Sequence, residues 1–155
     1  MRPWMPARKL ADEDGNAPIE FLVGGVILLV PLVYLGIALA AIQGASLATE
    51  GAAREAARVY VSAATDASGR TAADRAVTVA LADRRLPRRD GDLELSCEGA
   101  APGGDCLETG TRVTATIHTE VALPFIPPIF GLDKAARVPV EATATAPVFR
   151  LGEAP

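Results

Sequence analysis

The feature that most constrains this chain is an unbroken apolar run, residues 21–42, which contains no charged side chain. At about 1.5 Å per residue, a helix over this run is about 33 Å long, enough to cross a hydrocarbon core of about 30 Å. A removable signal peptide has a shorter apolar core, typically about 7–15 residues. A buried helix of a soluble protein rarely stays apolar on every face. The run therefore predicts a retained transmembrane helix.

The basic residues around this run predict its orientation. Arg2, Arg8 and Lys9 precede the span, whereas the first basic residue after it is Arg54. Because Lys and Arg near a span favour the cytoplasmic side, we expect the N-terminus in the cytoplasm. Everything after about Gln43 is then extracytoplasmic. The predicted location is the cytoplasmic membrane, crossed once.

The chain divides into three parts. Residues 1–15 form a polar leader. Residues 16–64 can form one long helix with its span at about 21–42, because nothing after the span stops it. Residues 65–155 form an extracytoplasmic head domain. Pro31 lies inside the span and removes one helical hydrogen bond, which predicts a kink.

The long helix carries two patterns of small residues. One is a ridge at a spacing of four, which permits close approach of helices in membranes but can also arise by chance in an Ala-rich sequence. The other is a stripe that can cover the core of the head. The ridge consists of Gly36, Ala40, Gly44, Ala48, Ala52 and Ala56. The stripe consists of Ala53, Ala56, Ala57, Tyr60, Val61 and Ala64.

A second helix is expected at about residues 71–86, after a break at residues 66–70. Thr71 is the expected N-cap and Pro87 the stop. The arginines at its end could bind anionic lipid or a partner. The interpretation favoured by the sequence is a solvated helix end, with Asp90 and Asp92 as counter-charges. The cluster comprises Arg84, Arg85, Arg88 and Arg89.

Three later segments alternate between apolar and polar residues, which predicts antiparallel strands with one buried face. They begin at about Leu93, Thr111 and Arg137. Pro139 indicates that the third strand starts late or lies at an edge. The predicted fold class is therefore α+β, with the long helix, a second helix and a sheet of about three strands. His118 falls on the polar side of its strand, as a surface residue.

Cys97 and Cys106 lie in the predicted extracytoplasmic part, where an oxidising environment favours a disulfide. Closing a loop of about ten residues stabilises a fold by about 2–3 kcal/mol in the chain-entropy view. A metal or redox site is the alternative, but the spacing matches no zinc or thioredoxin motif. The apolar, proline-rich loop at residues 123–132 could pack on the core, touch the membrane or meet a partner.

Catalytic signals are missing from the sequence. It contains no nucleophile elbow, phosphate-binding loop or zinc-protease motif. We therefore expect no enzyme activity, no cofactor and no catalytic metal site. The formal net charge of −4 gives no reason to expect nucleic-acid binding.

The junction before the apolar run is Gly15-Asn16-Ala17-Pro18-Ile19-Glu20-Phe21. Together with the following helix and the continuation GAAREAARVY, it resembles the TadE-like family. These are minor pilins or pseudopilins of tight-adherence, Flp-type pilus systems. The resemblance covers residues 13–64. This chain departs from the family pattern in the acidic residues 12–14 and in Pro18.

The resemblance implies processing like that of type IV pilins. A prepilin peptidase would cut after Gly15, so that Asn16 becomes the N-terminus and Glu20 the fifth mature residue. Phe21 stands where the major pilins of the system have Tyr. The implied partners are membrane lipid, the peptidase, other pilin or pseudopilin subunits and the assembly platform. The alternative is an uncleaved single-pass binding or adhesion protein. A membrane-tethered enzyme using Cys97, Cys106 or His118 is the weakest hypothesis.

Overall fold

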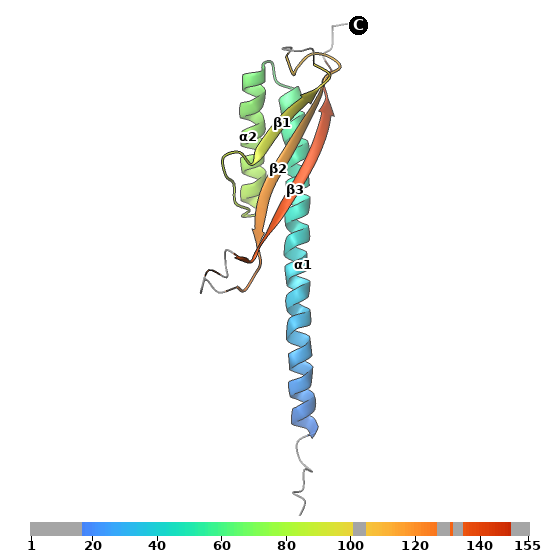
Figure 1. The fold of residues 1–155 in the computed structure, drawn as a ribbon, viewed down its shortest axis with the longest axis vertical. Coiled ribbons are helices and arrows are strands. Elements are labelled where there is room, and N and C mark those ends of the chain that lie inside the picture. The colour runs from blue at the N-terminus through green and yellow to red at the C-terminus, as the bar shows by residue number, and fades with distance from the viewer. Residues whose placement is uncertain (1–16, 101–104, 127–130, 132–134, 150–155) are drawn as a thin grey trace, which may run out of the picture. The chain divides into compact units, whose positions relative to one another are not determined.

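The computed structural model describes residues 17–100, 105–126, 131 and 135–149. It contains helices α1 (Ala17–Val61) and α2 (Asp66–Asp83) and strands β1 (Leu93–Glu98), β2 (Arg112–Ala122) and β3 (Arg137–Pro147), as Figure 1 shows. The chain forms two compact units, residues 1–37 and 38–155, whose boundary falls inside α1. The predicted α+β class is confirmed.

The described part of the first unit consists of the N-terminal half of α1. Its large apolar side chains are exposed, and the helix continues through Pro31. A stretch of this length with uncovered leucine, isoleucine and valine would be insoluble in water, so it needs an apolar environment from outside the unit.

The second unit, residues 38–155, contains the predicted head domain together with the C-terminal half of α1, and it is called the head from here on. Three surfaces meet in one core: α1, one face of α2 and one face of the sheet. Each supplies side chains at the spacing of its element, about every fourth residue on the helices and every second on the strands. The fully buried members include Ala53, Ala56, Ala57, Tyr60, Ala73, Val77, Leu81, Val113, Ala115 and Ile117.

Alanine forms most of the surface that α1 gives to this core. Because alanine has only a methyl group, the sheet and α2 can approach the helix closely. The predicted stripe is confirmed at Ala53, Ala56, Ala57 and Tyr60. The helix ends at Val61, however, so Ala64 lies beyond it and is exposed.

The predicted start of the second helix is wrong. Residues 66–70 do not break the chain but form the first turn of α2. Thr65, not Thr71, is the N-cap: its side chain accepts a hydrogen bond from the Ser68 amide, and the Ser68 hydroxyl accepts one from the Thr65 amide. This reciprocal capping box satisfies two amides that the helix itself leaves unpaired. The helix ends at Asp83, earlier than the expected Leu86.

The three predicted strands are confirmed as an antiparallel sheet in the order β1-β2-β3. Along β2, residues facing the helices are buried and the others are partly exposed. On the outer face, Thr114 pairs with Thr145 and Thr116 with Thr143, with hydroxyl oxygens 2.9 and 3.3 Å apart. Pro139 lies in the edge strand β3, as its chemistry predicts.

A second, smaller apolar cluster lies at the end of the head where the chain enters it. Ala45 packs there with Val121 and Val140. Ala41 and Ile42 pack against the same cluster. The last residues of the predicted span, 21–42, are therefore covered by the head. The continuous run of exposed large apolar side chains ends at Leu39, and on the described part of α1 only Leu47 is exposed in this way after it.

The capped start of α2 leads to a first prediction, at Gly69. A Cβ added there would lie 3.0 Å from Tyr60 Cδ2 and 3.1 Å from the Tyr60 carbonyl oxygen. The clash should cost about 1–3 kcal/mol. It outweighs the gain of about 1 kcal/mol that alanine brings to a helix. We expect Gly69→Ala to destabilise the head by about 1 kcal/mol on balance, measured as a lower thermal midpoint in detergent.

Gly51→Ala is the matched control. Gly51 is also helical, but an added Cβ has no neighbour within 4 Å. This variant should gain stability by up to about 1 kcal/mol. If Gly69→Ala raised the thermal midpoint instead, the Tyr60 side chain and carbonyl group would have to shift aside with little loss of free energy.

Candidate functional site

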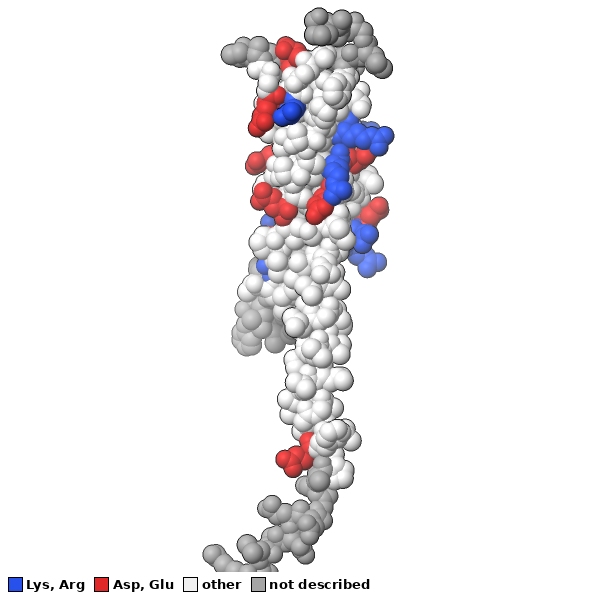
Figure 2. Space-filling view, turned by 90° about the vertical axis from the view of Figure 1, so that its right-hand side faces the viewer, with Lys and Arg blue, Asp and Glu red and all other residues white. Residues whose placement is uncertain are grey.

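The candidate site begins with the exposed apolar part of α1. Among the described residues, only the helix covering Pro18–Val61 is long and apolar enough to cross a membrane, with a mean hydropathy of 2.6 in its most apolar window. Figure 2 shows an uncharged surface along most of this helix. Glu20 is the only charged residue between 18 and 49. Phe21, the next residue, is 83% exposed. Gly15 and Asn16 lie outside the described residues.

The ridge of small residues is divided between two environments. Gly36 and Ala40 are exposed, Gly44 and Ala48 are half-buried, and Ala52 is fully buried in the core of the head. The C-terminal part of the ridge is thus used inside the head. Only its N-terminal part is open to another helix.

The predicted disulfide is confirmed. Cys97 on β1 is bonded to Cys106, with an S–S distance of 2.05 Å and a Cα–Cα distance of 5.6 Å. Both residues are half-buried and pack against the main core. The described residues contain no group of three or more side chains suited to holding a metal ion. The bridge therefore ties the segment after β1 to the core.

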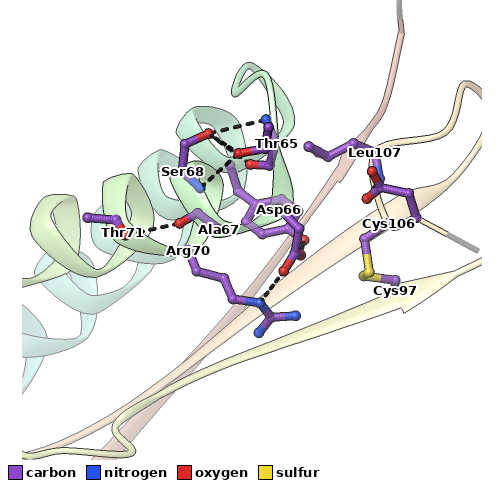
Figure 3. Close-up of polar contacts among 11 residues, drawn as sticks. Thr65, Asp66, Ala67, Ser68, Arg70, Thr71, Cys97, Cys106 and Leu107 are labelled. Carbon is purple, nitrogen blue, oxygen red and sulfur yellow. Dashed lines mark hydrogen bonds and ion pairs between the residues drawn. A yellow bond between two sulfur atoms is a disulfide. The ribbon is translucent and has the colours of Figure 1, made fainter.

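The disulfide lies near a polar cluster at the turn between α1 and α2 (Figure 3). The fully buried Tyr60 donates a short hydrogen bond from its hydroxyl to Asp66 Oδ1. Arg70 Nε donates to Asp66 Oδ2 over 2.8 Å. These three residues, here called the turn cluster, connect the last turn of α1 to the first turn of α2.

The turn cluster shifts the protonation of its members. Burial, and then the hydrogen bond to Asp66, raise the pKa of Tyr60 to about 12. Hydrogen bonds from Arg70 and then Tyr60 lower the pKa of Asp66. Asp66 thus stays ionised and Tyr60 neutral over the whole physiological range. The cluster stabilises the turn between the two helices, and neither Tyr60 nor Asp66 changes its protonation state near pH 7.

His118 lies on the outer face of the sheet, where the sequence pattern predicts it. Its Nδ1 is 3.4 Å from Glu141 Oε2 across the β2–β3 pair. The side chain is partly exposed. This is a cross-strand surface pair, of the kind that contributes a few tenths of a kcal/mol up to about 1 kcal/mol to a sheet.

Together these observations define a pilin-like architecture: a long N-terminal apolar helix, then a second helix and a three-stranded antiparallel sheet packed on the first helix. No protein-family model, curated protein or solved structure matches the chain.

Sequence reasoning missed the turn cluster. Two signals pointed to it: the Thr65-x-x-Ser68 spacing of a capping box, and Asp66 and Arg70 four residues apart. Both fall in the segment that was expected to be a break. The contact of Asp66 with Tyr60 depends on the tertiary fold and has no signal in the sequence.

The disulfide leads to a second prediction. Reducing it, or replacing both cysteines by alanine, should destabilise the head by about 2–3 kcal/mol, because the unfolded chain regains the freedom of a short loop. The thermal midpoints of the oxidised, reduced and double-alanine forms measure this. Equal midpoints for the oxidised and reduced forms would show that the bridge contributes nothing to stability.

The turn cluster leads to a third prediction. Tyr60 is held neutral in the fold, with a pKa of about 12 against an ordinary value near 10. Its contribution to stability is therefore complete below pH 10 and is lost as the pH rises towards 12. The thermal midpoint of the wild type should fall more steeply between pH 10 and pH 12 than that of Tyr60→Phe.

The same variant removes one hydrogen bond, so near pH 7 it should be less stable by about 1 kcal/mol. If the thermal midpoints of the two proteins fall in parallel between pH 10 and pH 12, the pKa of Tyr60 is not raised by the fold.

Proposed function

We propose that this chain is a TadE-like minor pilin or pseudopilin, a membrane-inserted substrate of prepilin peptidase that takes part in pilus assembly or secretion. The observation that carries the proposal is the division of α1. One helix exposes a continuous run of large apolar side chains up to Leu39 and then, from Ala52, covers the core of an α+β head mostly with alanine. A helix of this kind can leave a bilayer for the apolar centre of a filament without any change in its own structure.

The N-terminal junction gives Glu20 a role in this function. A carboxylate at the edge of hydrocarbon is costly unless it is paired or hydrated. Cleavage after Gly15 creates an α-amino group on Asn16, which is positively charged near neutral pH. In the proposed assembly, Glu20 pairs with that group on its own chain or on a neighbouring subunit. Phe21 then begins the apolar stretch.

The proposed protein is a structural subunit and not an enzyme, and it uses no cofactor and no nucleic acid. It resides in the cytoplasmic membrane with its N-terminus in the cytoplasm and its head outside, and it can be extracted into a pilus. Its partners are membrane lipid, prepilin peptidase, other pilin or pseudopilin subunits and the assembly platform. The open part of the ridge, Gly36 and Ala40, is the proposed contact for a neighbouring helix.

The processing step is a fourth prediction. Mass spectrometry of the protein extracted from membranes should give a mature N-terminus at Asn16. Gly15→Ala should leave the chain uncut. Glu20→Gln should permit the cut but reduce incorporation into sheared pili, because the partner of the new amine is lost.

Glu50→Gln is the matched control, since Glu50 lies on the same helix but forms an exposed ion pair with Arg54. It should change neither cutting nor incorporation. An uncut wild-type chain that stays in the membrane fraction without pilus genes would overturn the proposal and favour a single-pass adhesion protein.

A further inference from the structure

The arginines after α2 fall into two groups. Arg88 pairs with Asp74 and lies 3.9 Å from Asp92. Arg89 forms two hydrogen bonds with Glu120, at 3.1 and 2.9 Å. These two arginines are therefore neutralised within the head. The expected counter-charge Asp92 is confirmed, while Asp74 and Glu120 are partners that the sequence did not indicate.

Arg84 and Arg85 are different. In the described residues neither guanidinium group has an ion pair or a hydrogen bond, and both residues are exposed. The backbone of Arg85 has a φ of 56°, a left-handed conformation that is unusual for a residue with a side chain. The neighbouring carboxylate of Asp83 lines a separate groove with Glu55 and Arg75.

These two arginines line one hollow of about 390 Å³ together with Arg137 and Glu120. Glu120 is shared, since it pairs with Arg89 and lies 3.6 Å from Arg137. The lining of the hollow thus contains three arginines and a single carboxylate, which is already paired. The hollow has an excess of positive charge and can accept an anion.

An exposed aromatic side chain lies at the same end of the sheet. Phe125 follows β2 by three residues, is 80% exposed and has a φ of 62°. The Leu123 amide donates to the Ala136 carbonyl over 3.0 Å, which holds the beginning of this loop beside the start of β3. Arg137 is the first residue of β3, so Phe125 and the arginine hollow share one edge of the head.

This edge is also where α1 enters the head. Leu86, Val121 and Val138, which flank the hollow, belong to the small apolar cluster that packs against Ala41 and Ile42. The chain before Ala38 is the exposed apolar segment. The chain therefore passes from this edge into the exposed apolar segment within a few residues.

We propose that this edge of the head, formed by Arg84, Arg85, Arg137 and Phe125, docks on the surface of an anionic bilayer. The arginines bind phosphate groups of acidic lipids, for which guanidinium is well shaped. The phenylalanine lies at the level of the headgroups, where aromatic side chains gather. The proposal rests on the membrane insertion in the proposed function but not on cleavage or assembly.

The test uses the full chain with a single tryptophan as a depth probe. Trp4→Phe removes the only native tryptophan, and Phe125→Trp places one at the docking edge. The protein is reconstituted at low density in phosphatidylcholine vesicles, with or without phosphatidylglycerol. The acyl chains carry bromine near the headgroup. Phe149→Trp is the matched control, because Phe149 is 79% exposed and follows the opposite end of β3.

We expect the bromolipids to quench the Phe125→Trp variant strongly in anionic vesicles and much less in pure phosphatidylcholine, with little quenching of the Phe149→Trp variant. Adding Arg84→Gln and Arg85→Gln to the Phe125→Trp variant should reduce its quenching to the level of the control. High salt should do the same, because it screens the arginines.

Equal, weak quenching of the two tryptophan variants would overturn the proposal. The proposal would also be overturned if quenching of the Phe125→Trp variant were the same with and without anionic lipid and with and without the two arginine substitutions. Quenching that changes with the protein-to-lipid ratio would instead identify a second copy of the chain as the occupant. The mass of the N-terminus in the same sample reports separately on processing, so failure of one proposal does not mimic failure of the other.

Discussion

The structure depends on one helix meeting two environments. From Ile19 to Leu39 α1 exposes large aliphatic side chains, and from Ala52 to Ala57 it covers a protein core with alanines. The backbone is helical throughout, while the buried side chains become small and the exposed ones become charged. Large side chains gain most from lipid, whereas alanine lets a sheet and a second helix approach closely. Everything else in the head is arranged around that narrow surface.

The two ends of the head are stabilised by different forces. At the end where α1 stops, the capping box, the turn cluster and the disulfide hold the chain reversal in place. At the end where the chain enters, a few aliphatic side chains and two ion pairs hold the segment that follows α2: Arg88 pairs with Asp74 of α2, and Arg89 pairs with Glu120 of β2. The first end is covalently tied. The second depends on small apolar contacts and on charge.

The sequence predicted those features that follow from local periodicity. Alternation along residues 111–121 and 137–145 predicted two strands and the apolar run predicted a long helix, and these elements are confirmed. The disulfide, predicted from the expected oxidising compartment, is confirmed as well. The predicted start of α2 was wrong because Ser68 and Gly69 are residues that often interrupt helices. In the structure Ser68 completes a capping box, and Gly69 leaves room for Tyr60.

Features that depend on tertiary contacts could not be predicted. Pairs such as Arg89 with Glu120, and the split of the arginines into paired and unpaired groups, join residues far apart in the sequence. At the N-terminal junction, Glu20 and Phe21 are exposed residues of α1. The roles assigned to them rest on chemistry and resemblance and stay predictions.

The edge strand β3 limits how heads can associate. A proline fits in a strand only where its nitrogen points away from the neighbouring strand. Residues an even number apart point their amides the same way, so Pro139 and Pro147 both face the open edge of the sheet. An incoming strand would find amide donors only between them and none opposite the prolines. The two prolines thus shorten the stretch of this edge that can pair with another strand, which lowers the tendency of heads to join edge to edge.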